Sequence, residues 1–233
     1  MNLQGKKALV FGGTSGIGLA TINMLQAQGA AVVAISRSPD KAGDLPGVEL
    51  VACDVRDEQA LAALFAAQAP YDVLISAATG GERAAGPFLQ MDLAGYRGSF
   101  DKLWGYTNVV RLGTEHLSAD GNIVLVSGAP ARRPKPGQAA IASVGGAVEQ
   151  FVRAVAPELA PKRINVVSPG VIDTPMFGND ADARAQMLAG ATAKNLIPRA
   201  GTPEEVAAGI MFVVQNDFVT GTTIDVDGGW VHA

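Results

Sequence analysis

Short apolar runs alternate with longer amphipathic runs along most of this chain. The apolar runs have the length of buried strands, and the amphipathic runs repeat their apolar positions with a helical period. Strands are expected at residues 7–11, 31–36, 48–53, 72–77 and 222–226, and helices at 19–28, 57–68, 100–117, 138–159 and 203–215. This alternation predicts an α/β fold, a doubly wound (Rossmann) parallel sheet of about seven strands with helices on both faces.

Three segments bear on the boundaries of these elements. Thr202-Pro203-Glu204-Glu205 forms a capping box, with proline at the first helical position and glutamate at the third, so a helix should begin there. Gly145-Gly146 and Pro157 weaken the helix expected at 138–159. Residues 79–99 are rich in glycine and are expected to form a loop with little regular structure.

Length and charge limit the fold and the partners. The chain of 233 residues is 48% hydrophobic, and one α/β domain spanning residues 1–233 accounts for all of it. A net charge of −4 argues against a nucleic-acid partner, which usually requires a basic surface. The basic segment Arg132-Arg133-Pro134-Lys135 is either a solvated loop or, because it follows an expected strand, a loop that faces the substrate.

The remaining composition argues against several other kinds of site. Cys53 cannot form an internal disulfide and ends an apolar run, so a small buried side chain is expected. His116 and His232 lie near no cysteine or carboxylate cluster, so no metal is expected. We find no signal-peptide core, and no apolar run that approaches the ~20 residues of a membrane helix, so a cytoplasmic protein without a membrane partner is expected.

A glycine-rich turn follows the first apolar run. Lys7-Ala8-Leu9-Val10-Phe11 leads into Gly12-Gly13-Thr14-Ser15-Gly16-Ile17-Gly18 and then into a helical run. Gly12 allows a tight turn, Gly16 lets the backbone approach a pyrophosphate, and Gly18 lets the helix pack close to the strand. The helix N-terminus offers N–H groups and a partial positive charge to phosphates. Strand, glycine turn and helix together predict a dinucleotide site.

The end of the second expected strand indicates which dinucleotide binds. An NAD site places Asp or Glu there for the ribose 2′-hydroxyl, whereas this chain has Ser36-Arg37-Ser38. A guanidinium with adjacent hydroxyls suits a 2′-phosphate, which presents charge and acceptor oxygens. NADP(H) is therefore the expected cofactor, and the alternative is that Arg37 is an ordinary exposed side chain in a turn.

Four segments in order resemble the short-chain dehydrogenase/reductase family over nearly the whole chain. They are the turn at 12–18 with its Gly-x-x-x-Gly-x-Gly spacing, a strand at 121–127, a strand with a Pro-Gly loop at 164–175, and the C-terminal segment 220–229. The resemblance implies that Asp54 and Val55 contact the adenine, and that Ile172 and Thr174 hold the nicotinamide carboxamide. The family's Asn-Asn-Ala-Gly motif reads Ser76-Ala77-Ala78-Thr79 here, a departure at the nicotinamide end of the site. The expected cofactor-binding residues are Gly12, Thr14, Ser15, Gly16, Ile17, Gly18, Ser36, Arg37, Ser38, Asp54, Val55, Ala77, Ala78, Pro169, Gly170, Ile172 and Thr174.

This chain departs from the family at its catalytic positions. Aligning Glu158-Leu159-Ala160-Pro161 with the matching helix end puts the family's Tyr-x-x-x-Lys on Ile141 and Gly145, and its catalytic serine on Gly128. A shift of one residue would make Ser127 the serine. Ser143 is another hydroxyl in this region, and neither serine has an evident base in the sequence. The loss of a positioned general acid typically costs about 10²–10⁴ in rate.

Lys102 is the candidate replacement for the missing proton donor. The family's Asn-x-x-Gly aligns with Lys102-Leu103-Trp104-Gly105, so a lysine stands where an asparagine helps to hold the proton relay. Tyr106 follows at i+4 on the same helical face. A crossover helix runs away from the cofactor edge, however, which would place Tyr106 about 6 Å farther from the nicotinamide. The alternatives are a surface lysine at 102 and a core tyrosine at 106.

Two classes of function follow from these residues. The first is an atypical NADP(H)-dependent short-chain oxidoreductase that acts on a carbonyl or alcohol small molecule, with the proton coming from Lys102, water or the substrate itself, and with Ser127 as a second candidate side chain. The second is a non-catalytic NADP(H)-binding sensor or scaffold of the same fold. The family commonly assembles through its long helices and last strand, and small side chains line the helix expected at 138–159, so a homodimer or homotetramer is expected.

Overall fold

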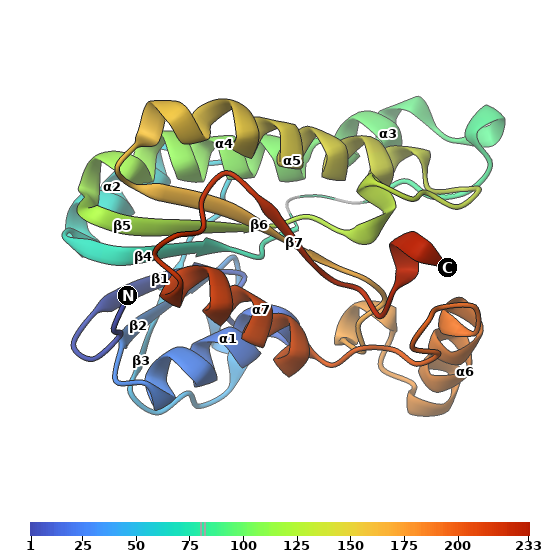
Figure 1. Cartoon of the computed structure of the whole chain (residues 1–233), viewed down its shortest axis with the longest axis horizontal. Helices are drawn as coiled ribbons and strands as arrows, with labels where there is room; N and C mark the ends of the chain where they lie inside the picture. The colour runs from blue at the N-terminus through green and yellow to red at the C-terminus, as the bar shows by residue number, and fades with distance from the viewer. Residues whose placement is uncertain (80, 82) are drawn as a thin grey trace.

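A seven-stranded parallel sheet forms the centre of the protein (Figure 1). The computed structural model describes residues 1–79, 81 and 83–233. The strands lie in the order β3-β2-β1-β4-β5-β6-β7, and each neighbouring pair is parallel. Their bounds are β1 Lys7–Phe11, β2 Ala31–Ser36, β3 Val48–Ala52, β4 Tyr71–Ser76, β5 Leu117–Val126, β6 Arg163–Pro169 and β7 Thr223–Val226. The predicted doubly wound α/β fold is confirmed.

Helices cover both faces of this sheet (Figure 1). One face carries α1 and α7, which pack against each other, and the other carries α2, α4 and α5. The short helix α3 precedes α4, and α6 follows β6, at the end of the molecule toward which the strands run. The bounds are α1 Gly16–Ala27, α2 Glu58–Gln68, α3 Leu93–Ser99, α4 Asp101–Gly113, α5 Ala139–Leu159, α6 Ala181–Thr192 and α7 Pro203–Gln215.

Successive strand residues supply two separate cores. In β1, Leu9 and Phe11 enter the core beneath α2, α4 and α5, whereas Ala8 and Val10 enter the core beneath α1 and α7. Because both faces are covered, the central strands read as continuous apolar runs. The strand order reverses at β1, since β2 and β3 lie on one side of it and β4 to β7 on the other. Such a reversal leaves a crevice outside the carboxyl ends of the strands.

The structure corrects several of the sequence expectations. Residues 93–99 form helix α3 within the segment predicted as a loop at 79–99, of which residues 80 and 82 lie outside the described part of the chain. Asp92 caps this helix by accepting a hydrogen bond from the Gly95 N–H at 2.7 Å. Helix α4 ends at Gly113 rather than near residue 117, where β5 already begins. Helix α6 was not predicted at all.

Helix α5 runs without interruption from Ala139 to Leu159, although glycines and a proline weakened its prediction. By length and composition alone this helix could cross a membrane. Its Val148 and Val152 side chains are buried in the core shared with β5 and β6. The apolar face of α5 thus packs against the sheet.

Candidate active site

A cavity of about 1100 Å³ opens at the carboxyl ends of the central strands. All seventeen residues that the sequence predicted as cofactor-binding line this one cavity. The candidates Lys102 and Ser127 line it too, as do Gly128, Ile141 and Gly145. Residues at the ends of β1, β2, β5 and β6, and residues directly after β3 and β4, meet there because parallel strands end at the same edge of a sheet.

The glycine turn after β1 forms a cradle that side chains would fill. Gly12 and Gly16 have φ angles of 76° and 49°, a region that other residues rarely adopt. A Cβ on Gly12 would lie 2.9 Å from the backbone nitrogen of Ala78, and one on Gly18 would overlap the carbonyl oxygen of Gly12. Ser15 is the N-cap of α1 but makes no side-chain cap hydrogen bond. The first N–H groups of α1 and the Ser15 hydroxyl are thus placed as a pyrophosphate requires.

The end of β2 provides hydroxyl and cationic groups. The buried Ser36 Oγ has no hydrogen-bond partner among the described residues. Arg37 forms no ion pair with any described residue, and the turn at Pro39–Ala42 brings Lys41 to the cavity wall. Sequence reasoning did not single out Lys41. Two cations beside serine hydroxyls fit the 2′-phosphate of NADP, which presents a negative charge and acceptor oxygens.

Asp54 and Cys53 lie after β3, at the adenine end that the resemblance implied. Arg56 donates to both carboxylate oxygens of Asp54, with Nε 3.1 Å from Oδ1 and Nη2 2.8 Å from Oδ2. These hydrogen bonds from Arg56 lower the pKa of Asp54, against the opposing effect of burial. Burial raises the pKa of the Cys53 thiol to about 11, so this thiol stays protonated near neutral pH.

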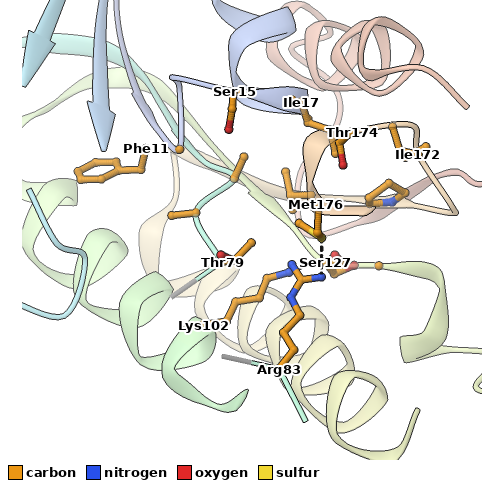
Figure 2. Close-up of a pocket in the computed structure, with 18 of the residues that line it drawn as sticks. Phe11, Ser15, Ile17, Thr79, Arg83, Lys102, Ser127, Ile172, Thr174 and Met176 are labelled. Atoms are coloured by element: carbon orange, nitrogen blue, oxygen red, sulfur yellow. Dashed lines mark hydrogen bonds between the residues drawn. The ribbon is translucent and has the colours of Figure 1, made fainter. Parts of the chain in front are cut away.

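Lys102 reaches the cavity from the first turn of α4. Its Nζ donates to the backbone carbonyl oxygen of Ser127 at 3.2 Å and lies 5.5 Å from the centre of the Tyr106 ring. Burial, with a smaller contribution from the positive charge of Arg83, lowers the pKa of Lys102 to about 7. Figure 2 shows the Lys102 ammonium and the Arg83 guanidinium close together at this side of the cavity. Lys102 is therefore not an ordinary surface lysine.

The other candidate hydroxyls are already engaged. Ser127 Oγ donates to the buried carboxylate of Glu149 at 3.1 Å. Tyr106 donates its hydroxyl proton to the Val126 carbonyl oxygen at 3.0 Å and is 1% exposed, so it is the core tyrosine of the alternative reading. Ser143 Oγ donates to the Ala139 carbonyl oxygen at 2.8 Å and lies 2.9 Å from the hydroxyl of Tyr96. Neither Ser143 nor Tyr106 lines the cavity.

Arg83 is the cavity residue that sequence reasoning missed most clearly. The residue as a whole is exposed, but its guanidinium reaches into the cavity and donates to Met176 Sδ at 3.1 Å. Burial of the guanidinium lowers the pKa of Arg83. Met176, Phe177 and Trp230 add apolar surface to the cavity wall. No periodic pattern in the glycine-rich segment marked Arg83 in advance.

The basic loop 132–135 is neither simply solvated nor part of the cavity wall. Arg132 pairs with the carboxylates of Asp225 and Glu149. Lys135 Nζ lies 3.5 Å from the centre of the Trp230 ring, and the Trp230 indole donates to the Arg133 carbonyl oxygen at 3.0 Å. The loop therefore fixes Trp230 rather than the substrate. In the described part of the chain, no group of three or more His, Cys, Asp or Glu side chains could hold a metal.

Comparison with known proteins identifies the class to which this fold and cavity belong. A family model described as enoyl-(acyl carrier protein) reductase matches residues 12–231. The chain is 31% identical to L-xylulose reductase of Bos taurus over 243 residues, which cover 99% of this chain and 98% of the relative. The chain belongs to the short-chain dehydrogenase/reductase family of oxidoreductases.

Solved structures agree with this assignment. A small-chain dehydrogenase in complex with NADPH is 30% identical, with a TM-score of 0.87 over 99% of this chain and 100% of the other. A short chain dehydrogenase/reductase family protein is 31% identical, with a TM-score of 0.86 over the full length of both chains. The cavity described above therefore occurs in a fold that binds NADPH in at least one relative.

Proposed function

We propose that this chain is an NADP(H)-dependent oxidoreductase that reduces the carbonyl group of a small molecule, with Lys102 as the proton donor. The observation that carries the proposal is the position of Lys102, whose ammonium lies in the cavity with a pKa lowered to about 7. A general acid is most effective when its pKa lies near the working pH. No tyrosine lines the cavity among the described residues.

The nucleotide half of the proposal rests on the turn after β1 and the end of β2. The N–H groups at the start of α1 would hold the pyrophosphate, and Arg37, Lys41 and Ser36 would hold the 2′-phosphate. The NADPH complex of a related small-chain dehydrogenase supports this choice of cofactor. Ile172 and Thr174 would hold the carboxamide, as the family resemblance implies.

The chemical step needs one hydride and one proton. Bound NADPH would supply the hydride for the carbonyl carbon, and the carbonyl oxygen would take up the electron pair of the C=O π bond. Lys102 Nζ then gives its proton to that oxygen and becomes a neutral amine, which water reprotonates. The Ser127 carbonyl oxygen orients the ammonium through the 3.2 Å hydrogen bond. In this proposal Gly128, Ile141 and Gly145 occupy the positions of the family's catalytic residues and supply no proton.

The test compares Lys102→Met with Lys194→Met, since Lys194 is an exposed lysine that does not line the cavity. Reduction of a panel of small carbonyl compounds, L-xylulose among them, is followed by NADPH absorbance. In Lys102→Met we expect kcat/KM to fall by about 10²–10⁴ and the Kd for NADPH to stay within about threefold. Lys194→Met should match the wild type in both.

Two results would reject the proposal. Full turnover in Lys102→Met would make Lys102 a structural residue. If the wild type binds NADPH but reduces nothing in the panel, the chain is the non-catalytic NADP(H)-binding sensor or scaffold.

A further inference from the structure

We propose that the substrate end of the cavity binds a carboxylate between Arg83 and Lys102, so that the substrate is a carbonyl compound that also carries an acid group. This inference rests on the proposed function, because it names the substrate class of the same site. It begins from a feature that the proton-donor role of Lys102 does not require, a second cation beside it.

The two cations lie together, and no carboxylate of the described residues pairs with them. Arg83 comes from the segment before α3 and Lys102 from the start of α4, and their charged ends lie side by side in Figure 2. Among the described residues neither side chain forms an ion pair. Their hydrogen-bond acceptors are the Ser127 carbonyl oxygen and the Met176 thioether sulfur, both uncharged.

Two carboxylates in the described part of the chain, Asp101 and Glu149, are engaged by other groups. Asp101 adjoins Lys102 in sequence, but its Oδ2 accepts from Arg56 Nη1 at 3.0 Å. Glu149 accepts from Ser127 Oγ and pairs with Arg132 and Arg153. Two like charges in a partly desolvated cavity repel each other, and an anion placed between them removes that repulsion.

The donor chemistry favours a carboxylate. The planar guanidinium of Arg83 uses one N–H on Met176, and its remaining donors match the two oxygens of a carboxylate. The cavity lining also includes the apolar side chains of Ile141, Val144 and Phe177. A carboxylate needs only the paired N–H donors of Arg83 and the Lys102 ammonium, and an acid group on an apolar body fits this surface.

The pair lies away from the phosphate cradle. Figure 2 shows Ser15 and Ile17 on one side of the cavity and Lys102 and Arg83 on the opposite side. The N–H groups at the start of α1 already provide a place for the cofactor pyrophosphate. The anion between Arg83 and Lys102 is therefore assigned to the substrate.

Binding of the carboxylate should depend on pH in a defined direction. The groups that face Lys102 are Arg83, the Tyr106 ring and the Ser127 carbonyl oxygen. The carboxylate binds the protonated ammonium best. Because Lys102 loses its proton as the pH rises through about 7, the Kd should rise above that pH, by up to about tenfold per pH unit.

The experiment measures binding without turnover. Trp230 lines the cavity and is one of two tryptophans, so Trp104→Phe leaves it as the only tryptophan reporter. This protein, saturated with NADP⁺, is titrated with phenylacetate, with its neutral analogue phenylacetamide and with benzylphosphonate. We expect phenylacetate to bind at least about tenfold more tightly than phenylacetamide and more tightly than benzylphosphonate. A tenfold ratio corresponds to about 1.4 kcal/mol.

Variants then test whether the tighter binding of phenylacetate depends on Arg83. In the same background, Arg83→Met should weaken phenylacetate binding at least about tenfold, whereas Arg97→Met, at an exposed position of α3 outside the cavity, should not change it. Arg83→Lys keeps the charge without the planar fork and should lose part of the affinity. The Kd for NADP⁺ should stay within about threefold in all three variants.

Several outcomes would overturn the inference. They are equal binding of phenylacetate and phenylacetamide, tighter binding of benzylphosphonate, no binding of either phenyl acid, or unchanged affinity in Arg83→Met. The proposed function is tested separately by following reduction of phenylpyruvate, a 2-oxo acid. If phenylacetate binds as expected and no carbonyl compound is reduced, the carboxylate site stands and the proposed function fails. If neutral carbonyl compounds are reduced while phenylacetate does not bind, the proposed function stands and the carboxylate site fails.

Discussion

Replacing Lys102 by methionine should make the protein more stable, and the gain should depend on pH. The folded structure lowers the pKa of this lysine from its usual 10.5 to about 7, chiefly by burial. Between these two values the unfolded chain holds a proton that the folded chain has released, so folding becomes more favourable as the pH rises through this window. The cost of Lys102 to stability is therefore complete below about pH 7 and vanishes near pH 10.5.

The size of the cost follows from the same shift. One pKa unit corresponds to about 1.4 kcal/mol, which sets an upper limit of about 5 kcal/mol. Lys102 is only partly buried and faces a cavity that admits water, so screening reduces this figure, and we expect about 2 kcal/mol. Lys102→Met keeps most of the apolar stem and removes the charge. It also removes the hydrogen bond to the Ser127 carbonyl oxygen, which is worth about 1 kcal/mol or less where water can replace it.

Urea unfolding of the wild type and Lys102→Met at about pH 6 and about pH 10 measures this difference. The variant should be more stable by about 2 kcal/mol at the lower pH and nearly equal at the higher one. Lys194→Met, at an exposed position, should follow the wild type at both values. A variant that is less stable than the wild type at pH 6, or a difference that does not change with pH, would refute the reasoning.

Four further predictions concern other parts of the molecule. Arg37→Ala should lower the preference for NADPH over NADH, expected to be at least about tenfold in the wild type, and fluorescence titration with both cofactors checks it. Gly145→Ala should lower the free energy of unfolding in urea by about 1 kcal/mol, because the added Cβ would lie 2.9 Å from Cβ of Ala131. This loss is expected although alanine has a better helix propensity than glycine. Thr202→Ala should lower the free energy of unfolding in urea by about 1 kcal/mol, because it removes the side-chain cap of α7. Light scattering at micromolar concentration should give the mass of a homodimer or homotetramer, and a monomeric mass would contradict this.

The nucleotide end of the site could be predicted from sequence because its parts are local. Strand, glycine turn and helix follow one another within residues 7–27, and each glycine has a steric reason that is visible in the pattern. The remaining predicted residues stand at the ends of other parallel strands, and those ends must meet at one edge of the sheet. Thus Ser36, Ala78 and Pro169, far apart in the chain, line the same cavity.

Helix α3 could not be predicted in the same way. Its seven residues include Gly95 and Gly98, which are poor helix formers. The helix forms because Asp92 caps it and because it packs against α5, a contact that does not exist locally. Asp92 is a residue type that typically caps a helix, but no helical repeat of apolar residues follows it in the sequence. Tertiary packing therefore decided the structure of this segment and, with it, the place of Arg83.

The position of Gly145 gives a steric reason why the ammonium comes from α4 in the proposed function. The turn after β5 brings Ala131 against α5, so close that even a methyl group at position 145 would require a shift. A lysine in this place would have to displace that turn, whereas Gly128 has no such neighbour within 3.4 Å of an added Cβ. Lys102 instead enters the cavity from the first turn of α4, where the Ser127 carbonyl oxygen accepts its hydrogen bond. The close packing of Ala131 at position 145 and the Lys102 ammonium on another wall of the cavity are thus two parts of one arrangement. Gly145 and Lys102 could both be named from the sequence, whereas the contact with Ala131 could not.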